Sequence, residues 1–507
     1  MGNQKRSKDK GFAFVITDTS GRTNSEDRKL IRSHVMRGKN RRATCANPVN
    51  PKRSSSWVTH DTTEPVQETN QLYHVPNDLY MFQFAEDVDA GSRAMLFEFY
   101  GVIKETMYPI EWCLSLDSSK NPWFYWLMSD AAFLHSILFT VGLLHDSIVG
   151  KTSKRTSFHV WKTLSLLNQN ISDKDLALAD STIATVVSMC MVSEVFGDRD
   201  SAAAHVKGMR RIVELRGGIE TFRHNLQLKI KICRVDIGWY LCTGEKPHYY
   251  RDTISWETAF ASILGDSPAG FERDREPCQI RRLLNSTDRR VGNIFQDLHD
   301  FSQLANFLVQ TGHKIDPNMF QDLMTSIQYR LLYLEPTTQD KVTEMLRLGM
   351  TSYITTLFLK VQGTKIPLSF LTGQLRSACQ NIEVSEFPST TARHIFAWTL
   401  VVGAISVLEE YDDVWLLPKL ASLRESLGPT WPEAKAKLEQ VMWMEFIHSP
   451  GGVKVFEKLV LHVAKVPPTS SLQRKGPNKP ALSPPMERLS SVKDVIFEPH
   501  ATEAAVY

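Results

Sequence analysis

The sequence predicts an all-α fold: a large multi-helix domain packed as helical hairpins, between a basic N-terminal arm and a disordered C-terminal tail. Apolar residues recur at three- and four-residue spacing through most of the chain, which is the period of an amphipathic helix. Strand-like alternation of apolar and polar residues is nearly absent. A hydrophobic content of 42% and a charged content of 23% are those of a globular protein.

The clearest hairpin is predicted over residues 180–220. Its first helix starts with Asp180 or Ser181 as N-cap, and the Gly197-Asp198 pair forms the turn. Its second helix ends at Gly217 and Gly218. The apolar stripe of that second helix is Ala202, Val206, Met209, Ile212 and Val213. The residues expected on the water-facing side are Lys207, Arg210, Arg211 and Glu214.

The second helix of this hairpin carries a family resemblance. The run AHVKGMRRIVELRGGIE resembles the pattern His-x-x-Gly-hydrophobic-x-x-hydrophobic-Val-x-x-Arg-Gly-Gly of the fungal-specific transcription factor domain. This domain is the all-helical region behind the binuclear zinc cluster of fungal regulators. The motif residues, which we interpret as structural, are His205, Gly208, Arg216, Gly217 and Gly218. Arg216 lies at the edge of the apolar stripe, so we expect it to brace the hairpin against its neighbours.

The N-terminal segment extends the resemblance. FAFVITDTS, followed by RKLIRSHVMRGKNRR, is similar to the opening of a subgroup whose members often have the helical domain without the zinc cluster. Together the two resemblances imply a transcriptional regulator in the nucleus, with the cytoplasm as the alternative location. They imply protein partners, either other transcription proteins or a homo- or heterodimer. A small-molecule effector is left open.

Charge is distributed unevenly along the chain. Residues 1–60 contain 14 Lys and Arg but 4 Asp and Glu, a net charge of +10, whereas the remaining residues carry −7. A basic arm on a mildly acidic body indicates contact with nucleic acid or a nuclear-import signal, and a solvated arm is the alternative. The candidate contacts are Arg28, Lys29, Arg32, Arg37, Lys39, Arg41 and Arg42. They include no stacking aromatic and no base-reading helix, so binding would be mainly non-specific.

Composition and helical periodicity divide the sequence into four segments. They are a basic arm over 1–42, a disordered linker over 43–77, the helical domain over 78–466 and a disordered tail over 467–507. Polar residues and prolines dominate the linker and the tail. Beyond the hairpin, helices are predicted near 225–242, 254–264, 293–311, 317–333, 340–360, 367–381, 391–410, 413–426, 431–447 and 451–465.

Motifs for zinc binding and catalysis are missing. The seven cysteines are widely spaced and form no Cys-x-x-Cys, so neither a zinc finger nor the six-cysteine cluster can form from them. The acidic run Glu409 to Asp413 lacks the spacing of a metal-dependent terpene synthase and fits an acidic helix junction better. We therefore expect no enzyme, no metal and no cofactor. No uninterrupted apolar run is long enough to span a membrane, so no membrane contact is expected.

Three functions remain open at this stage. The first is a transcriptional regulator without a zinc cluster, acting through protein partners or through DNA contacts of its basic arm. The second is a helical scaffold with no role at DNA, and the third is an uncharacterised all-α enzyme. An effector pocket in the first case could use large aromatic side chains, although such residues more often pack in cores. They are Trp123, Phe124, Trp126, Trp239, Tyr240, Trp398 and Trp415.

Overall fold

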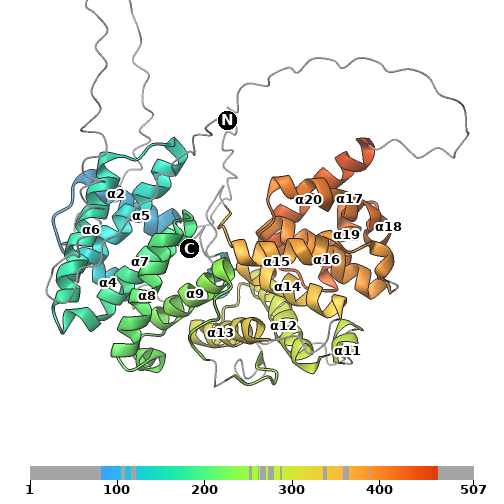
Figure 1. Cartoon of the computed structure of the whole chain (residues 1–507), viewed down its shortest axis with the longest axis horizontal. Helices are drawn as coiled ribbons and strands as arrows, with labels where there is room; N and C mark the ends of the chain where they lie inside the picture. The colour runs from blue at the N-terminus through green and yellow to red at the C-terminus, as the bar shows by residue number, and fades with distance from the viewer. Residues whose placement is uncertain are drawn as a thin grey trace, which may run out of the picture. The chain divides into compact units, whose positions relative to one another are not determined.

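The computed structural model confirms the all-α prediction (Figure 1). It describes residues 82–103, 109–115, 122–250, 254–260, 262, 270–271, 279–285, 288–334, 340–357, 365–387 and 389–465. Within these ranges the regular structure is helical, and the one bridge pairs Leu114 with Ile315. The chain divides into two units, Met1–Val463 and Ala464–Tyr507. In the second unit only Ala464 and Lys465, the end of the last helix, are described.

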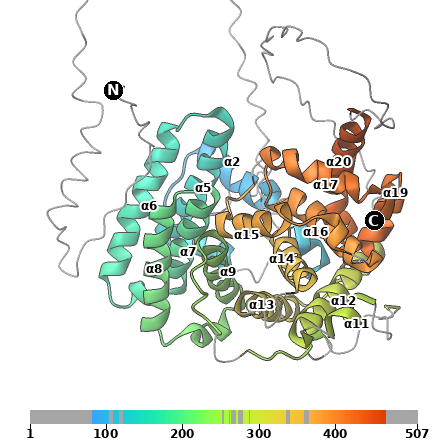
Figure 2. The same ribbon diagram turned by 45° about the vertical axis from the view of Figure 1, so that its right-hand side comes forward.

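The N-terminal helices pack around α5. It contacts α2, α4, α6 and α7, all of which lie in the N-terminal group of helices (Figures 1 and 2). The bounds are α2 Ala90–Glu98, η2 Phe99–Ile103, η3 Pro109–Cys113, α4 Pro122–Ser129, α5 Ala131–Val149, α6 Lys154–Ser172, η5 Leu176–Leu178 and α7 Asp180–Val195. Residues 132–139 of α5 are all buried because neighbouring helices cover several of its sides.

The position of α5 explains its composition. Among the described residues, α5 is the one helix long and apolar enough to cross a membrane by length and composition alone. The sequence pattern does not single it out, because polar residues such as His135 and Ser136 interrupt its apolar run. In the structure 56% of the apolar window is buried inside the protein, which is where a core helix also needs apolar side chains.

Helix α6 is absent from the predicted helices, and its pattern explains why. Its buried residues at helical spacing are mostly polar: Thr156, His159 and Thr163. Its side chains exposed to solvent include Phe158 at 50% and Trp161 at 61%. A search for an apolar face therefore finds no clear stripe, although Ser153 caps the helix by accepting from the Thr156 backbone N–H.

Helix α9 joins the N-terminal helices to the rest of the domain. It contacts α7 and α8 as well as α13 and α15. The bounds here are α8 Arg199–Leu215, η6 Ile219–His224, α9 Leu226–Thr243, α11 Gln279–Asn285, α12 Arg289–Thr311, α13 Pro317–Tyr333 and α14 Lys341–Thr355. Arg330 of α13 donates to Asp297 of α12 at 2.6 Å, and both side chains are almost fully buried. This buried ion pair ties the two helices together.

Helices α15 and α16 pack against α14, and α17, α18 and α19 contact α16. The closest pairing is between α14 and α16, where Gly349 makes room for Trp398: a Cβ at position 349 would lie 2.5 Å from the indole ring. Trp398 is fully buried and donates to the carbonyl of Met442 at 2.6 Å. The bounds are α15 Ser369–Gln380, η7 Val384–Glu386, α16 Thr390–Ser406, η8 Glu410–Asp412, α17 Asp413–Ser422, α18 Arg424–Leu427, α19 Trp431–Glu439 and α20 Glu445–Lys465.

Several predicted helices differ from the structure: 391–410 extends past the end of α16 at Ser406, 413–426 is divided into α17 and α18, and two further differences are larger. Residues 254–259 are not helical, so the predicted helix over 254–264 is wrong at its start; there the Asp297 carboxylate accepts from the backbone N–H groups of Ala259 and Phe260. The predicted helix over 431–447 ends at Glu439, and α20 begins at Glu445 and continues through Pro450. A proline inside a helix removes one backbone hydrogen bond and is unfavourable there, so one continuous helix through Pro450 was not expected from the sequence.

The predicted arm (1–42), linker (43–77) and tail (467–507) lie outside the described residues. Their disorder and their boundaries therefore stay predictions.

Candidate functional site

The motif hairpin consists of α7 and α8. The turn between them is at Gly197, whose φ of 69° is readily adopted by glycine. The predicted stripe of α8 is buried: Ala202, Val206, Met209, Ile212 and Val213. The predicted start of α7 is wrong by one residue, because Ala179 is the N-cap and Asp180 lies in the first turn.

Asp180 is placed in that first turn to receive Arg216, which follows the end of α8. The Arg216 guanidinium pairs with the Asp180 carboxylate and donates to the carbonyl of Leu178 at 3.1 Å. It also lies over the Phe222 ring, 4.3 Å from the centroid. Asn225 donates to the other Asp180 oxygen at 2.7 Å. This network connects the start of α7, the end of α8 and the start of α9.

Electrostatics keep Asp180 ionised. Burial opposes ionisation, but the hydrogen bonds from Asn225 and Arg216 outweigh it and lower the pKa of Asp180. Gly217 and Gly218 complete the junction with φ of 103° and 96°. Their backbone N–H groups donate to the carbonyls of Glu214 at 3.0 Å and Val213 at 2.9 Å, the Schellman pattern that ends a helix.

The other two motif residues lie on α8 itself. Burial lowers the pKa of His205 to about 4, so its imidazole is neutral near pH 7. Gly208 is only partly buried, and a Cβ there would meet nothing within 4 Å. Close packing therefore does not require a glycine at position 208.

Arg210 is a residue whose role the sequence pattern missed. It was expected to face water, but its side chain is only 15% exposed and donates to Asp236 of α9 at 2.9 Å. Its second nitrogen donates to Glu245 at 2.5 Å. The partners lie 26 and 35 residues further along the chain, so no helical wheel of α8 could reveal them.

The candidate contacts of the basic arm lie outside the described residues. They are Arg28, Lys29, Arg32, Arg37, Lys39, Arg41 and Arg42. Their proposed role at DNA or in nuclear import stays a prediction.

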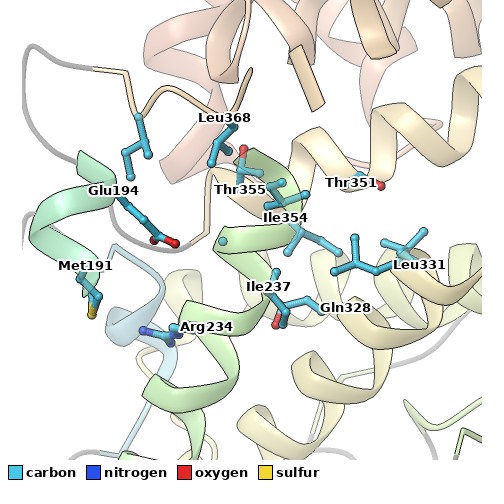
Figure 3. A pocket seen from close by; sticks show the side chains of 14 residues that line it. Met191, Glu194, Arg234, Ile237, Gln328, Leu331, Thr351, Ile354, Thr355 and Leu368 are labelled. Carbon is cyan, nitrogen blue, oxygen red and sulfur yellow. The ribbon is translucent and has the colours of Figure 1, made fainter. Parts of the chain in front are cut away.

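A cavity of about 100 Å³ lies beside the hairpin (Figure 3). It is partly open to solvent and is formed by α7, α9, α13, α14 and the segment before α15. Most of its lining is apolar: Met191, Ile237, Gly238, Leu241, Leu331, Leu332, Ile354, Ile366 and Leu368. Its polar lining residues are Glu194, Arg234, Gln328, Thr351 and Thr355.

Glu194 is the unusual member of this lining. It lies in the last turn of α7, is 9% exposed, and its carboxylate extends toward α9 (Figure 3). Its Oε1 has no hydrogen-bond partner among the described residues. Burial raises the pKa of Glu194 to about 8. No signal in the sequence pointed to this site, since its walls come from segments as far apart as Met191 and Leu368.

The aromatic residues considered for an effector pocket do not line this cavity. Trp239 donates to Glu245 at 2.7 Å, and Trp415 donates to Asp412 at 2.9 Å. Trp123 and Trp126 pack edge to face against each other. We therefore assign the whole set to packing: Trp123, Phe124, Trp126, Trp239, Tyr240, Trp398 and Trp415.

The acidic run Glu409 to Asp413 is a helix junction. Asp412 is 1% exposed and accepts two hydrogen bonds from Arg376 of α15, at 2.7 and 2.9 Å. The run therefore anchors the start of α17 on α15. Within the part of the chain that the structure describes, no group of three or more His, Cys, Asp or Glu is arranged to hold a metal ion.

These features define a helical domain in which a network around Asp180 and Arg216 holds the α7–α8 hairpin, with a cavity of about 100 Å³ next to it. Residues 96–239 match the family model of the fungal specific transcription factor domain. The match confirms, over this segment, the resemblance predicted from the motif, and it includes α4 to α8 and most of α9. No curated protein and no solved structure matches the chain. The match covers less than half of the chain and shows a resemblance to this family over residues 96–239.

Proposed function

We propose that this protein is a transcriptional regulator that works through its helical domain without a zinc cluster of its own. The observation that carries the proposal is the family match over residues 96–239, which contains the whole of the α7–α8 hairpin. The hairpin supports it further, because Arg216 and Asp180 join three segments at the motif. A rigid helical unit of this kind is suited to present a fixed surface to another protein.

The spacing of the cysteines limits how this protein can reach DNA. The sequence contains no Cys-x-x-Cys, so the family's zinc-cluster reader cannot form from these residues. We propose that protein partners bring the domain to its targets. These would be other transcription proteins or a further copy of this chain. The basic arm adds phosphate contacts, which strengthen binding to any DNA sequence without selecting one.

Binding to randomised duplex DNA across a salt series tests the route to DNA. The proteins compared are the full chain, a deletion of residues 1–60, and a variant with Lys39, Arg41 and Arg42 all changed to Gln. We expect weak binding without enrichment of any sequence, and a salt slope that falls by about 0.9 for each phosphate that is no longer neutralised. A matched control changes the exposed Lys207 and Arg211 of α8 to Gln and keeps the slope.

Two outcomes would count against the proposal in different ways. Enrichment of one sequence, abolished by deletion of residues 1–60, would make the arm a DNA reader and remove the need for a partner. Exclusion of the full chain from the nucleus would argue against regulation of transcription and favour a helical scaffold.

A further inference from the structure

The carboxyl group of Glu194 lacks the partners that buried acids normally have. Buried charges in proteins are paired or hydrogen-bonded, and leaving such a group unsatisfied destabilises the folded state. Glu194 is 9% exposed, and its Oε1 has no partner within the described ranges. Its position in the last turn of α7 adds to the cost, since the C-terminal end of a helix dipole disfavours a negative charge.

The protein nevertheless makes room for this carboxyl group. Glu194 approaches the backbone of α9 at Gly238, where a Cβ would lie 2.7 Å from Oε2 and 2.8 Å from Oε1. Figure 3 shows the Glu194 side chain extending from α7 toward α9, and the lining of the same cavity includes Leu331 of α13 and Ile354 of α14. An acid on an apolar wall, beside a glycine that accommodates it, is the arrangement of a site with one polar anchor.

The other charged lining residue is already engaged. Arg234 takes part in an interaction of its own, whereas burial alone accounts for the raised pKa of Glu194. Thr351 and Thr355 donate their hydroxyls to the carbonyls of Arg347 and Ser352 at 2.8 and 2.7 Å. Glu194 is therefore the lining group that most needs a partner from outside the chain.

We propose that this cavity binds a small primary amine with a branched hydrocarbon body, whose ammonium group pairs with the carboxylate of Glu194. The apolar lining would bury the hydrocarbon, and the ammonium would supply the hydrogen bonds and the charge that Glu194 lacks. A volume of about 100 Å³ is smaller than the roughly 150 Å³ of an apolar cavity that accepts benzene, so a body of about five carbons fits. The inference concerns a ligand of the helical domain and does not depend on how the protein reaches DNA.

Binding of an ammonium ion to Glu194 changes the number of protons bound to the protein. Below the pKa of about 8 the free acid is protonated, so binding of an ammonium ion releases one proton from Glu194 to solvent. The nearby titratable groups do not compensate: burial raises the pKa of Cys242 to about 12 and raises the pKa of Cys190 well above its ordinary value, so both thiols stay neutral. Arg234 stays charged. The lining residues from α13, α14 and the segment before α15 do not titrate.

Calorimetry on the purified full chain tests the site with isopentylamine. Isopentanol, which is neutral, and 4-methylpentanoate, which is an anion, have nearly the same body and serve as matched probes. We expect the amine to bind at least about tenfold more tightly than either, in line with a charge-assisted hydrogen bond. In buffers of different ionisation enthalpy, binding well below the pKa of Glu194 should release close to one proton, and binding well above it almost none.

Single substitutions test whether the preference for the amine depends on Glu194. Glu194→Gln keeps the volume and removes the charge, so we expect it to abolish the preference for the amine and the proton release. Glu214→Gln changes a carboxyl on α8 that is 48% exposed, and should leave both unchanged. Gly238→Ala should weaken amine binding by pushing the carboxylate aside. Thermal unfolding shows that each variant is folded.

Equal binding of the three probes to the unmodified protein would overturn the proposal, as would no binding of isopentylamine at millimolar concentration. Unchanged amine binding by Glu194→Gln would overturn it as well. None of these results depends on DNA or transcription, so failure here is distinct from failure of the proposed function.

Discussion

Arg210 of α8 donates to Asp236 of α9 at 2.9 Å, and the Asp236 side chain is fully buried. The same carboxylate accepts from the backbone N–H of His248 at 2.8 Å and from the hydroxyl of Tyr329 at 3.1 Å. Asp236 thus joins the motif helix, α9, α13 and the loop after α9 at one point. Through His248 and Tyr329, Asp236 is a polar link between the matched segment and later parts of the domain.

Asp236→Asn should destabilise the protein by about 3–4 kcal/mol. The change leaves a largely buried guanidinium without its counter-ion and replaces an acceptor that serves several donors. Chemical denaturation measures the difference. Glu245→Gln is the matched control, because its carboxyl is 54% exposed and shares the same arginine; we expect it to cost less than about 1 kcal/mol. If the two variants lost the same free energy of unfolding, Asp236 would contribute no more to stability than the exposed Glu245.

Two glycines of the motif should respond in opposite directions. Gly208→Ala should stabilise the protein by about 0.5–1 kcal/mol, because alanine is the better helix former and its Cβ meets nothing within 4 Å. Gly217→Ala should destabilise by about 1 kcal/mol or more, since its φ of 103° strains any side chain. Thermal unfolding of the two variants makes the comparison. A loss of stability in Gly208→Ala would mean that position 208 is crowded in solution.

The buried pair of His135 and His159 should make stability depend on pH. Their Nδ1 atoms are 2.8 Å apart, and burial together with the charge of His135 lowers the pKa of His159 to about 4. The unfolded chain, with a histidine pKa of about 6.5, binds the proton more readily between the two pKa values. The free energy of unfolding should therefore rise with pH across this window, by up to about 3 kcal/mol from His159.

His159→Gln should flatten this rise in urea titrations at several pH values. His145→Gln is the control, because the hydrogen bond with Glu98 raises the pKa of His145 and gives a dependence of the opposite sign. The same slope in the unmodified protein and in His159→Gln would exclude this histidine as the source.

Glu194 should produce the opposite trend at higher pH. Its pKa of about 8 in the folded protein lies above its ordinary value of 4.5, so the folded state holds the proton more tightly between these values. Its contribution is fully present below the lower value and is lost as the pH rises toward the higher one, by up to about 5 kcal/mol. Glu194→Gln should therefore gain stability relative to the unmodified protein as the pH rises through this window. A constant difference between the two proteins, measured by urea titration, would show that Glu194 does not titrate there.

The sequence predicted the parts of the fold that depend on local periodicity. The stripe of α8 from Ala202 to Val213 and the end of α8 at Gly217 follow from one helix and its cap, and both are as predicted. Helix α6 was missed because its buried side chains are polar and its exposed ones include Phe158 and Trp161. Tertiary packing overrode the local pattern there.

The cavity and the buried charges around it could not be predicted from the periodicity of single helices. A helical wheel assumes one buried face, but α7 contacts α5, α8 and α9, so even Glu194 near its end is buried. Arg210 was placed on the water-facing side because its partner Asp236 belongs to the following helix. The cavity combines residues from 191 to 368, an arrangement of distant segments that spacing along the chain cannot indicate.

A transcription assay tests the regulatory role most directly, with the full chain fused to an unrelated DNA-binding domain upstream of a reporter. We expect the fusion to change reporter output relative to the DNA-binding domain alone. Asp236→Asn, which weakens the helical domain, should reduce the change, whereas Glu245→Gln should retain it. A folded, nuclear fusion that leaves the reporter at the level of the DNA-binding domain alone would contradict a role in regulating transcription.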